Sequence, residues 1–277
     1  MRTSSDSLLT PVLITPALAF LIGAFFFPVG QILILSIAVP DGVSIWANFA
    51  RLFEDGYYAT VAWRTLRLST LIAFFCVLIG FPLAYAISKS RPWVKLLLLI
   101  ITVLPLMTSV VIRTFGWMIL FSRGGPVSSI LKAVGFSPGQ SVFMHTEHGL
   151  VIAMVQVMLP FMVLTTLGVL NSIHPNLEES SRTMGAGFYR TMRHVLLPLS
   201  ASGIASGAIL VFTLSISSFV TPNLVGGVRL PVMAGAIYQQ ATRTLDWNFA
   251  AAQSALLLGG VMLLLLPYLA LTRRRNG

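Results

Sequence analysis

The chain has 277 residues, of which 56% are hydrophobic and only 9% are charged. Soluble domains have about a quarter of their residues charged, so this composition excludes a soluble or disordered protein and indicates one that is embedded in a membrane. The net charge of +10 comes from 18 basic and 8 acidic residues with no dense basic tract before the last positions, which argues against a nucleic-acid-binding protein.

Long intervals without charge predict the membrane spans, because a helix of about 20 apolar residues crosses a hydrocarbon core about 30 Å thick. The first expected span is too long for a cleaved signal peptide, so we expect it to be retained. In chain order the six expected spans are residues 12–39, 68–88, 96–122, 149–177, about 200–220 and 249–271. We therefore predict an all-α, polytopic membrane protein with six transmembrane helices in a single domain, 1–277.

Six spans place both termini on the same side of the membrane, and the positive-inside rule favours the cytoplasm for that side. In this orientation ten basic residues lie on the cytoplasmic side and eight lie outside. The run from Arg273 to Arg275, directly after the last expected span, supports the same choice. We expect both termini to be cytoplasmic.

Several residues inside the expected spans point either to packing or to a moving path. Prolines bend the helices that contain them, and kinked helices either pack in this way or line a path that opens and closes. Gly203 and Gly207 form a small-x-x-x-small pattern that lets helices approach closely, within the chain or against a partner. We interpret the single cysteine, Cys76, as part of helix packing. The prolines in question are Pro28, Pro82, Pro105, Pro160 and Pro267.

The loop between the fourth and fifth spans carries more polar chemistry than the other loops. It holds two adjacent carboxylates and three arginines in about thirty residues that the membrane cannot accommodate. Asn176, followed three residues later by Glu179, is typical of a helix start. Glu178 and Glu179 both suit the positive end of a helix dipole, so we predict a short helix that begins here.

Two glycines predict where that short helix ends. Gly185 and Gly187 fit its C-terminal stop, and residues 188–195 are expected to form a second short helix that ends before Pro198. The loop is therefore predicted to be a helix-turn-helix at the cytoplasmic surface.

This loop resembles the EAA loop of the permease subunits of bacterial ABC importers, whose pattern is roughly E-A-A-x-x-x-G-A, then V-x-L-P and P-G-I. The chain departs from the pattern where Ser180 and Ser181 replace the alanines and Ser202 replaces the last proline. The tracts 113–117 and 218–227 resemble the first permease subunit of spermidine/putrescine-type importers. The residues that match the loop pattern are Glu179, Gly185, Ala186, Val195, Leu197, Pro198, Gly203 and Ile204.

The resemblance implies a type I ABC importer permease-like fold in the bacterial inner membrane. It also implies that residues 173–200 are a coupling loop that inserts a short helix into a cleft on a separate ATPase. For the two glutamates the alternative is helix capping alone. The expected ATPase-coupling residues are Glu178, Glu179, Arg182, Gly185, Ala186 and Arg190.

The implied chemistry and partners follow from the same resemblance. The chain lacks the G-x-x-x-x-G-K-[ST] loop that cradles nucleotide phosphates, so we expect ATP and Mg to be bound by the partner ATPase, with no cofactor in this chain. The expected partners are a homologous permease subunit in a heterodimer, two ATPase subunits and a periplasmic solute-binding protein. The chain would be a transport subunit and not an enzyme.

Five residues are candidates for the translocation path. Arg113 lies inside the third span, where it faces protein or water or else extends to the outer interface. The other four form a polar stripe in and after the fifth span, which borders the path in the resembled family. The candidates are Arg113, Ser215, Ser217, Ser218 and Thr221.

The solute stays open at this point. No Asp or Glu lies within any expected span, so no carboxylate of the spans would replace the lost hydration of a multiply charged amine. The resemblance favours a polyamine such as spermidine or putrescine, and relatives that handle opines, aminoethylphosphonate, ferric iron or thiamine share parts of the same tracts.

Three other functions fit the sequence less well. His145, Glu147 and His148 would need a further ligand to hold a metal, and we interpret them as a solvated loop. An ion-coupled secondary transporter predicts intramembrane carboxylates and an internal repeat, and we find neither. A membrane enzyme lacks motifs such as H-E-x-x-H and G-x-S-x-G.

Overall fold

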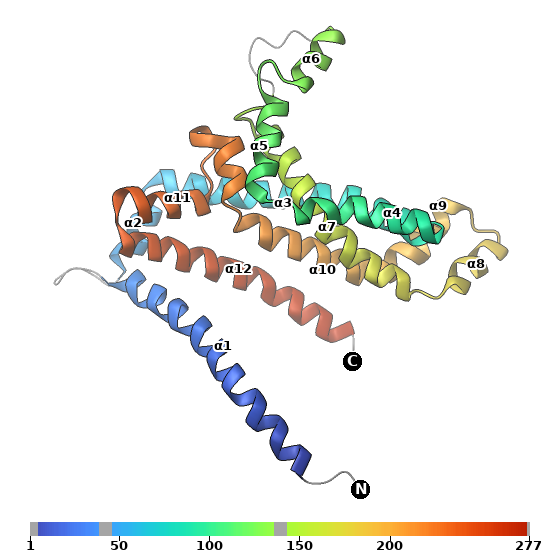
Figure 1. The fold of residues 1–277 in the computed structure, drawn as a ribbon, viewed down its shortest axis with the longest axis horizontal. Helices are drawn as coiled ribbons and strands as arrows, with labels where there is room; N and C mark the ends of the chain where they lie inside the picture. The colour runs from blue at the N-terminus through green and yellow to red at the C-terminus, as the bar shows by residue number, and fades with distance from the viewer. Residues whose placement is uncertain (1–4, 39–45, 136–142, 276–277) are drawn as a thin grey trace. The chain divides into compact units, whose positions relative to one another are not determined.

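The computed structural model describes residues 5–38, 46–135 and 143–275, with side chains described for 14–38, 46–135 and 143–263. These residues are almost entirely helical (Figure 1), which confirms the predicted all-α fold. The α-helices are α1 (Ser5–Ile37), α2 (Ala47–Glu54), α3 (Gly56–Lys89), α4 (Pro92–Val103), α5 (Val110–Phe121), α6 (Pro126–Ala133), α7 (Glu147–Ser172), α8 (Pro175–Thr183), α9 (Phe188–Thr191), α10 (Leu197–Ile216), α11 (Met233–Gln239) and α12 (Trp247–Arg275).

The chain divides into two compact units. The first contains residues 1–56 and 237–260, and the second contains residues 57–236 and 261–277. The expected single domain over 1–277 stays a prediction. The coupling loop and the candidate path residues all belong to the second unit.

Four stretches in the described part of the chain are long and apolar enough to cross a membrane. They are Ile14–Ile37, Gly56–Lys89, Glu147–Ser172 and Phe188–Ile216, and they correspond to the expected first, second, fourth and fifth spans. The fourth ends at Ser172 and not at 177, and the fifth ends at Ile216 and not at about 220. Residue 39, the last of the first expected span, lies outside the described residues. A bent helix pair brings the number to five if it counts as one span. The sixth expected span lies in α12, whose described apolar part, Trp247–Leu263, is shorter, so the count of six is not confirmed.

The third expected span, 96–122, is broken, and the expectation of one continuous helix is wrong. The helical stretch Pro92–Met107 and the stretch Val110–Ala133 meet at an angle of 99°. Pro105 removes a backbone donor in the 3-10 turn that ends the first stretch, and Thr108 and Ser109 then take extended conformations with ψ of 142° and 133°. Helical hydrogen bonding therefore stops at this point.

In the first unit, polar contacts join α2 to the end of α1 and to the start of α12. The Asn48 amide donates to the backbone carbonyls of Ser36 at 3.2 Å and Ala38 at 3.3 Å. Arg51 pairs with Asp246 at 2.9 Å, and its guanidinium carbon lies 4.2 Å from the ring centroid of Phe249. The start of α12 is thus fastened to α2 within this unit.

Close packing of α7 against α3 and α10 forms the core of the second unit. A Cβ added at Gly207 would lie 2.4 Å from Thr165 Oγ1, and one added at Gly203 would lie 2.8 Å from Val169 Cγ2. These glycines let α10 approach α7, so the small-residue pattern packs within the chain. On the other side of α7, Cys76 of α3 is fully buried with its thiol 3.7 Å from the Val155 carbonyl oxygen, which confirms its packing role.

The helices of the second unit place the loop between α7 and α10 at one end. Figure 1 shows α8 and α9 together beyond the ends of α3, α7 and α10. This is the predicted helix-turn-helix, and the residues around it form the candidate site.

Candidate functional site

The short helix α8 begins about two residues earlier than predicted. His174 is the residue before the helix, and its Nδ1 accepts a hydrogen bond from the Asn176 amide at 3.3 Å. Pro175 follows in the first turn, where its fixed φ suits a helix. The amides of a first turn have no hydrogen-bond partner within the helix, so the lack of an amide hydrogen on proline costs no helical bond there. The predicted short helix is therefore present, with His174 and not Asn176 as the residue that precedes it.

Gly185 forms the turn that ends α8, as the sequence predicted. Its φ is +83°, in the left-handed region that costs other residues about 1–2 kcal/mol. The Gly185 amide donates to the Arg182 carbonyl and the Ala186 amide donates to the Ser181 carbonyl, both at 3.0 Å. Gly187 has an ordinary φ of −66° and stands before α9, so it begins the second helix instead of ending the first.

The second short helix does not end before Pro198, which corrects the prediction. After α9 a π-helical turn, Met192–Leu196, leads directly into α10. The Leu197 amide donates to the carbonyl of Met192, five residues back. Proline cannot donate to the carbonyl four residues before it, and a π-helical turn lets the chain pass Pro198 without that bond.

A pair of hydroxyl groups ties the two short helices together. Ser181 Oγ in α8 lies 2.9 Å from Thr191 Oγ1 in α9, and Thr191 is buried. The turn at Gly185 joins the same two helices covalently. The two short helices are thus joined both by the turn at Gly185 and by the contact between Ser181 and Thr191.

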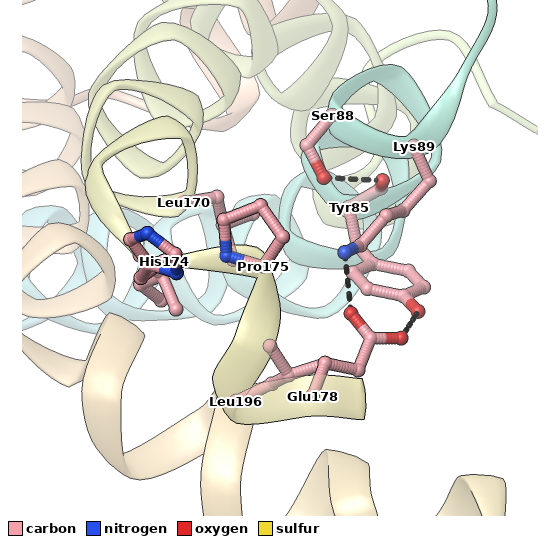
Figure 2. Close-up of a pocket in the computed structure, with 9 residues that line it drawn as sticks. Tyr85, Ser88, Lys89, Leu170, His174, Pro175, Glu178 and Leu196 are labelled. Carbon is pink, nitrogen blue, oxygen red and sulfur yellow. Dashed lines mark hydrogen bonds and ion pairs between the residues drawn. The ribbon is translucent and has the colours of Figure 1, made fainter. Parts of the chain in front are cut away.

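Glu178 is the buried charge of this site. The residue is 6% exposed, and its carboxylate contacts three groups of the same chain, two of which, Tyr85 and Lys89, are drawn in Figure 2. Tyr85 donates to Oε1 at 3.2 Å, Arg182 donates to Oε1 at 2.8 Å, and the Lys89 ammonium pairs with Oε2. Two of these groups come from the last turns of α3, so a residue of α8 is bound to the end of another helix.

The electrostatics of Glu178 follow from these contacts. Burial by itself would raise the pKa of the carboxyl, but the hydrogen bond and charge of Lys89, together with Tyr85 and Arg182, lower the pKa by more. The net pKa of Glu178 lies below its usual value, and the carboxylate is ionised at neutral pH.

The neighbouring residue, Glu179, lies in a different environment. Glu179 is exposed, and so are Arg182, Gly185 and Arg190, whereas Ala186 is half-buried. The sequence treats the two glutamates alike, but only Glu178 has its charge paired inside the chain among the contacts described here.

An apolar groove of about 280 Å³ lies between the two short helices. Met184 at its rim is 87% exposed. The groove brings together Ala186 and Arg190, two of the predicted coupling residues. It is lined by Ser181, Met184, Ala186, Arg190, Thr191, His194 and Val195.

The candidate path residues after the fifth span do not form one continuous stripe. Thr221 is buried, and its hydroxyl lies 3.0 Å from that of Thr114 in α5. Ser218 Oγ lies 3.8 Å from the sulfur of Met154 in α7. Ser217 is exposed and donates back to the Thr213 carbonyl at 3.0 Å.

Arg113 and Ser215 carry buried polar atoms for which the described residues offer no hydrogen-bond partner. Arg113 Nη2 donates to the Thr108 carbonyl at 3.0 Å, while its Nε and Nη1 make no such bond. Ser215 is 5% exposed, and its Oγ is likewise without a partner in the described part of the chain. Their place on a translocation path stays a prediction.

The histidine-rich segment before α7 has structural contacts. His145 Nδ1 lies 3.3 Å from the Gly226 carbonyl oxygen, and the Thr146 hydroxyl caps α7 by accepting from the Gly149 amide. Glu147 pairs with Arg67 of α3. Among the residues with described positions, no group of three His, Cys, Asp or Glu side chains is placed to hold a metal ion.

Sequence reasoning missed Tyr85 and Lys89 as members of the site. Lys89 directly follows the second expected span, on the same expected side of the membrane as the loop. Basic residues at such ends are natural partners for the carboxylates of the loop. That signal identifies a face of the membrane but not a pairing, because six basic residues compete for two glutamates. They are Lys89, Arg91, Lys95, Arg182, Arg190 and Arg193.

Comparison with known proteins places the chain among transport proteins. The family model described as binding-protein-dependent transport system inner membrane component matches residues 76–274. The spermidine/putrescine transport system permease protein PotB of Haemophilus influenzae is 30% identical over 249 residues, which cover 87% of either chain. The matched residues include the whole loop 173–200 and all five candidate path residues.

Solved structures share the fold. A bacterial alginate ABC transporter in complex with an alginate pentasaccharide-bound periplasmic protein has a chain that matches with a TM-score of 0.78, at 20% identity, over 98% of this chain and 95% of that one. A chain of the MetNI methionine ABC transporter in an inward-facing conformation matches with a TM-score of 0.59, at 21% identity, over 78% of this chain and 94% of that one.

Proposed function

Because the chain belongs to the family of binding-protein-dependent transport system inner membrane components, we propose that it is the permease subunit through which an ATP-driven importer passes a small organic solute. The chain is a multi-pass protein of the inner membrane and a transport subunit, not an enzyme. We propose that both of its termini lie in the cytoplasm.

One observation carries the coupling part of this proposal, namely the exposed outer face of the loop between α7 and α10. Glu179, Arg190 and Met184 are exposed there, beside the apolar groove between α8 and α9. A short helix with charged sides and an apolar edge suits a cleft on another protein. In this proposal that protein is an ATPase, which moves the loop when it closes on ATP.

The remaining partners complete the transporter. A homologous permease would pair with this chain as a heterodimer, two ATPase subunits would bind ATP and Mg, and a periplasmic protein would deliver the solute. The absence of a phosphate-binding loop from the sequence supports the assignment of ATP to a partner. The periplasmic protein in the structure of the similar alginate transporter supports the last of these partners.

A polyamine is the solute that the relatives favour. PotB of Haemophilus influenzae, which shares 30% identity, is a spermidine/putrescine permease by name. The interiors of the described apolar spans carry no Asp or Glu, so we assign the selection of a cationic solute to the periplasmic protein.

Reconstitution tests the proposal. The chain would be co-purified with its partners and placed in liposomes. The cognate periplasmic protein would be added to the assay medium. Stimulation of ATP hydrolysis would then be measured with spermidine, putrescine, an opine, aminoethylphosphonate and ferric iron. We expect stimulation by a polyamine, whereas stimulation by another solute alone would keep the permease assignment and overturn the polyamine assignment.

A further inference from the structure

The structure gives the two adjacent glutamates of the loop different roles. We propose that Glu178 is a positioning residue that anchors the loop to the end of α3, so that movement of the loop is passed to that helix, while Glu179 faces the partner. This inference rests on the proposed function, since it assumes that a partner moves the loop.

The contacts of Glu178 join two separate parts of the fold. Tyr85 and Lys89 lie four residues apart in the last turns of α3, and both reach the same carboxylate in α8 (Figure 2). Arg182, one helical turn further along α8, donates at 2.8 Å to Oε1, the same oxygen that accepts from Tyr85. The carboxylate therefore has partners on both helices.

Burial makes this connection hard to break. Glu178 is 6% exposed, so separating the loop from α3 would leave a charge with fewer partners inside the protein. An ionised group in such a place loses both its hydration and its counter-charge, which is strongly unfavourable. Exposed ion pairs contribute much less, because water screens them.

A second contact joins the end of α3 to the other short helix of the loop, α9. The ring of Tyr85 lies 6.1 Å from that of Phe188, measured between centroids, and Phe188 begins α9. Because Ser181 and Thr191 bind α8 to α9, the two short helices and the end of α3 form one connected group. A displacement of either short helix is then transmitted to α3.

The length and packing of α3 allow a displacement at its end to affect helix packing inside the membrane. A helix of 34 residues is about 50 Å long, enough to cross the membrane. Nine residues before the end of α3, a Cβ added at Gly80 would lie 2.7 Å from Met162 Cγ, so α3 is in tight contact with α7. Movement of the loop at one end of α3 would therefore alter packing inside the membrane.

The test compares matched variants in the complete transporter, reconstituted with its partners and the periplasmic protein. Glu178→Gln and Lys89→Met remove the two halves of the ion pair, and Glu54→Gln, which removes an exposed carboxylate of α2 outside the loop, is the control. The measured quantity is the number of solute molecules taken up for each ATP hydrolysed, normalised to assembled complex. We expect Glu178→Gln and Lys89→Met each to lower this ratio at least about tenfold while ATP hydrolysis stays within about twofold.

The double variant decides whether the two residues act together. If they form one anchor, Glu178→Gln combined with Lys89→Met lowers the ratio no further than either single change. Multiplicative losses would overturn the inference, as would a normal ratio in Glu178→Gln or an equal loss in Glu54→Gln. A merely structural defect would reduce the amount of assembled complex and leave the ratio unchanged, which also contradicts the anchor.

A second measurement separates this inference from the proposed function. Hydrogen exchange of the α8 amides in the assembled, full-length protein needs no transport. We expect exchange to be at least about tenfold faster in Glu178→Gln and Lys89→Met than in the unchanged protein and in Glu179→Gln. Unchanged exchange would overturn the anchor even if transport is observed, whereas faster exchange in a complex that transports nothing would refute the proposed function alone.

Discussion

The carboxylate of Glu178 accepts a hydrogen bond of 3.2 Å from the phenol of Tyr85, which joins the loop between α7 and α10 to the end of α3. The next residue in the chain, Glu179, is exposed. Two neighbouring carboxylates of the same sequence motif thus differ in burial and in partners. Their difference allows the connection inside the permease to be tested separately from the connection to an ATPase.

The turn at Gly185 gives a prediction about coupling. Its φ of +83° is strained for a side chain with a branched Cβ, although a Cβ placed there would meet no atom within 4 Å. We expect Gly185→Val to lower ATP-driven uptake at least about fivefold without loss of membrane insertion, because the left-handed conformation costs about 1–2 kcal/mol. Gly185→Asn should retain most uptake, since asparagine tolerates this conformation. Uptake assays in vesicles with equal amounts of inserted protein would measure both.

Gly187→Ala is the control for that prediction. Gly187 has a φ of −66° and open space around its Cα, so alanine should be accepted. Normal uptake by Gly185→Val, or an equal loss in Gly187→Ala, would contradict the role of the turn.

The charge of Glu178 predicts a pH dependence of stability. Its pKa in the folded protein lies below that in the unfolded chain, so the ionised carboxylate favours folding above the unfolded-state pKa. This contribution is lost as the pH falls through the lower, folded-state pKa. We therefore expect Glu178→Gln to lower the Tm by a few degrees at pH 7, and by progressively less as the pH falls below about 4.3, the ordinary pKa of a glutamate, in thermal unfolding of the purified protein. A constant difference across this range would contradict the ionised pairing.

Glycine packing gives a prediction about stability in the core. A Cβ at Gly207 would lie 2.4 Å from Thr165 Oγ1 and 2.7 Å from Met162 Sδ, whereas a Cβ at Gly168 would meet nothing within 4 Å. Overpacking of this kind costs about 1–3 kcal/mol. We expect Gly207→Ala to lower the Tm clearly and Gly168→Ala to leave it nearly unchanged, and equal effects would show that α10 does not need this close approach to α7.

The buried hydroxyls of Thr114 and Thr221 predict a non-additive pair. They lie 3.0 Å apart, and each is 1% exposed. Either single change to Val leaves the other hydroxyl without this partner and should cost about 1 kcal/mol, while the double change should cost less than the two single changes together. Thermal unfolding of the four proteins measures the coupling, and strict additivity would contradict a direct interaction.

Hydropathy and local helix rules predicted much of this fold. The all-α class, four of the expected spans and the helix stop at Gly185 are confirmed, because each depends on residues close together in the sequence. The break in the third span and the passage of the chain through Pro198 were not predicted. Both depend on how the backbone accommodates a proline, by ending a helix in one case and by a π-helical turn in the other.

The candidate site was predicted as a loop but not as a set of contacts. Sequence spacing placed Glu178 and Glu179 on the same short helix, and it gave no means to tell which carboxylate would be buried. Tyr85, one of the two partners of Glu178 in α3, lies 93 residues before Glu178 in the sequence. Such contacts depend on the packing of α3 beside the loop, which local patterns do not specify.

The central claim is that this chain carries solute only when a partner hydrolyses ATP. The direct measurement is solute uptake into sealed vesicles that contain the complete transporter, with the periplasmic protein outside and ATP inside. We predict uptake that requires both ATP and the periplasmic protein and that persists when ion gradients are dissipated. Uptake driven by an ion gradient in the absence of ATP would contradict the account.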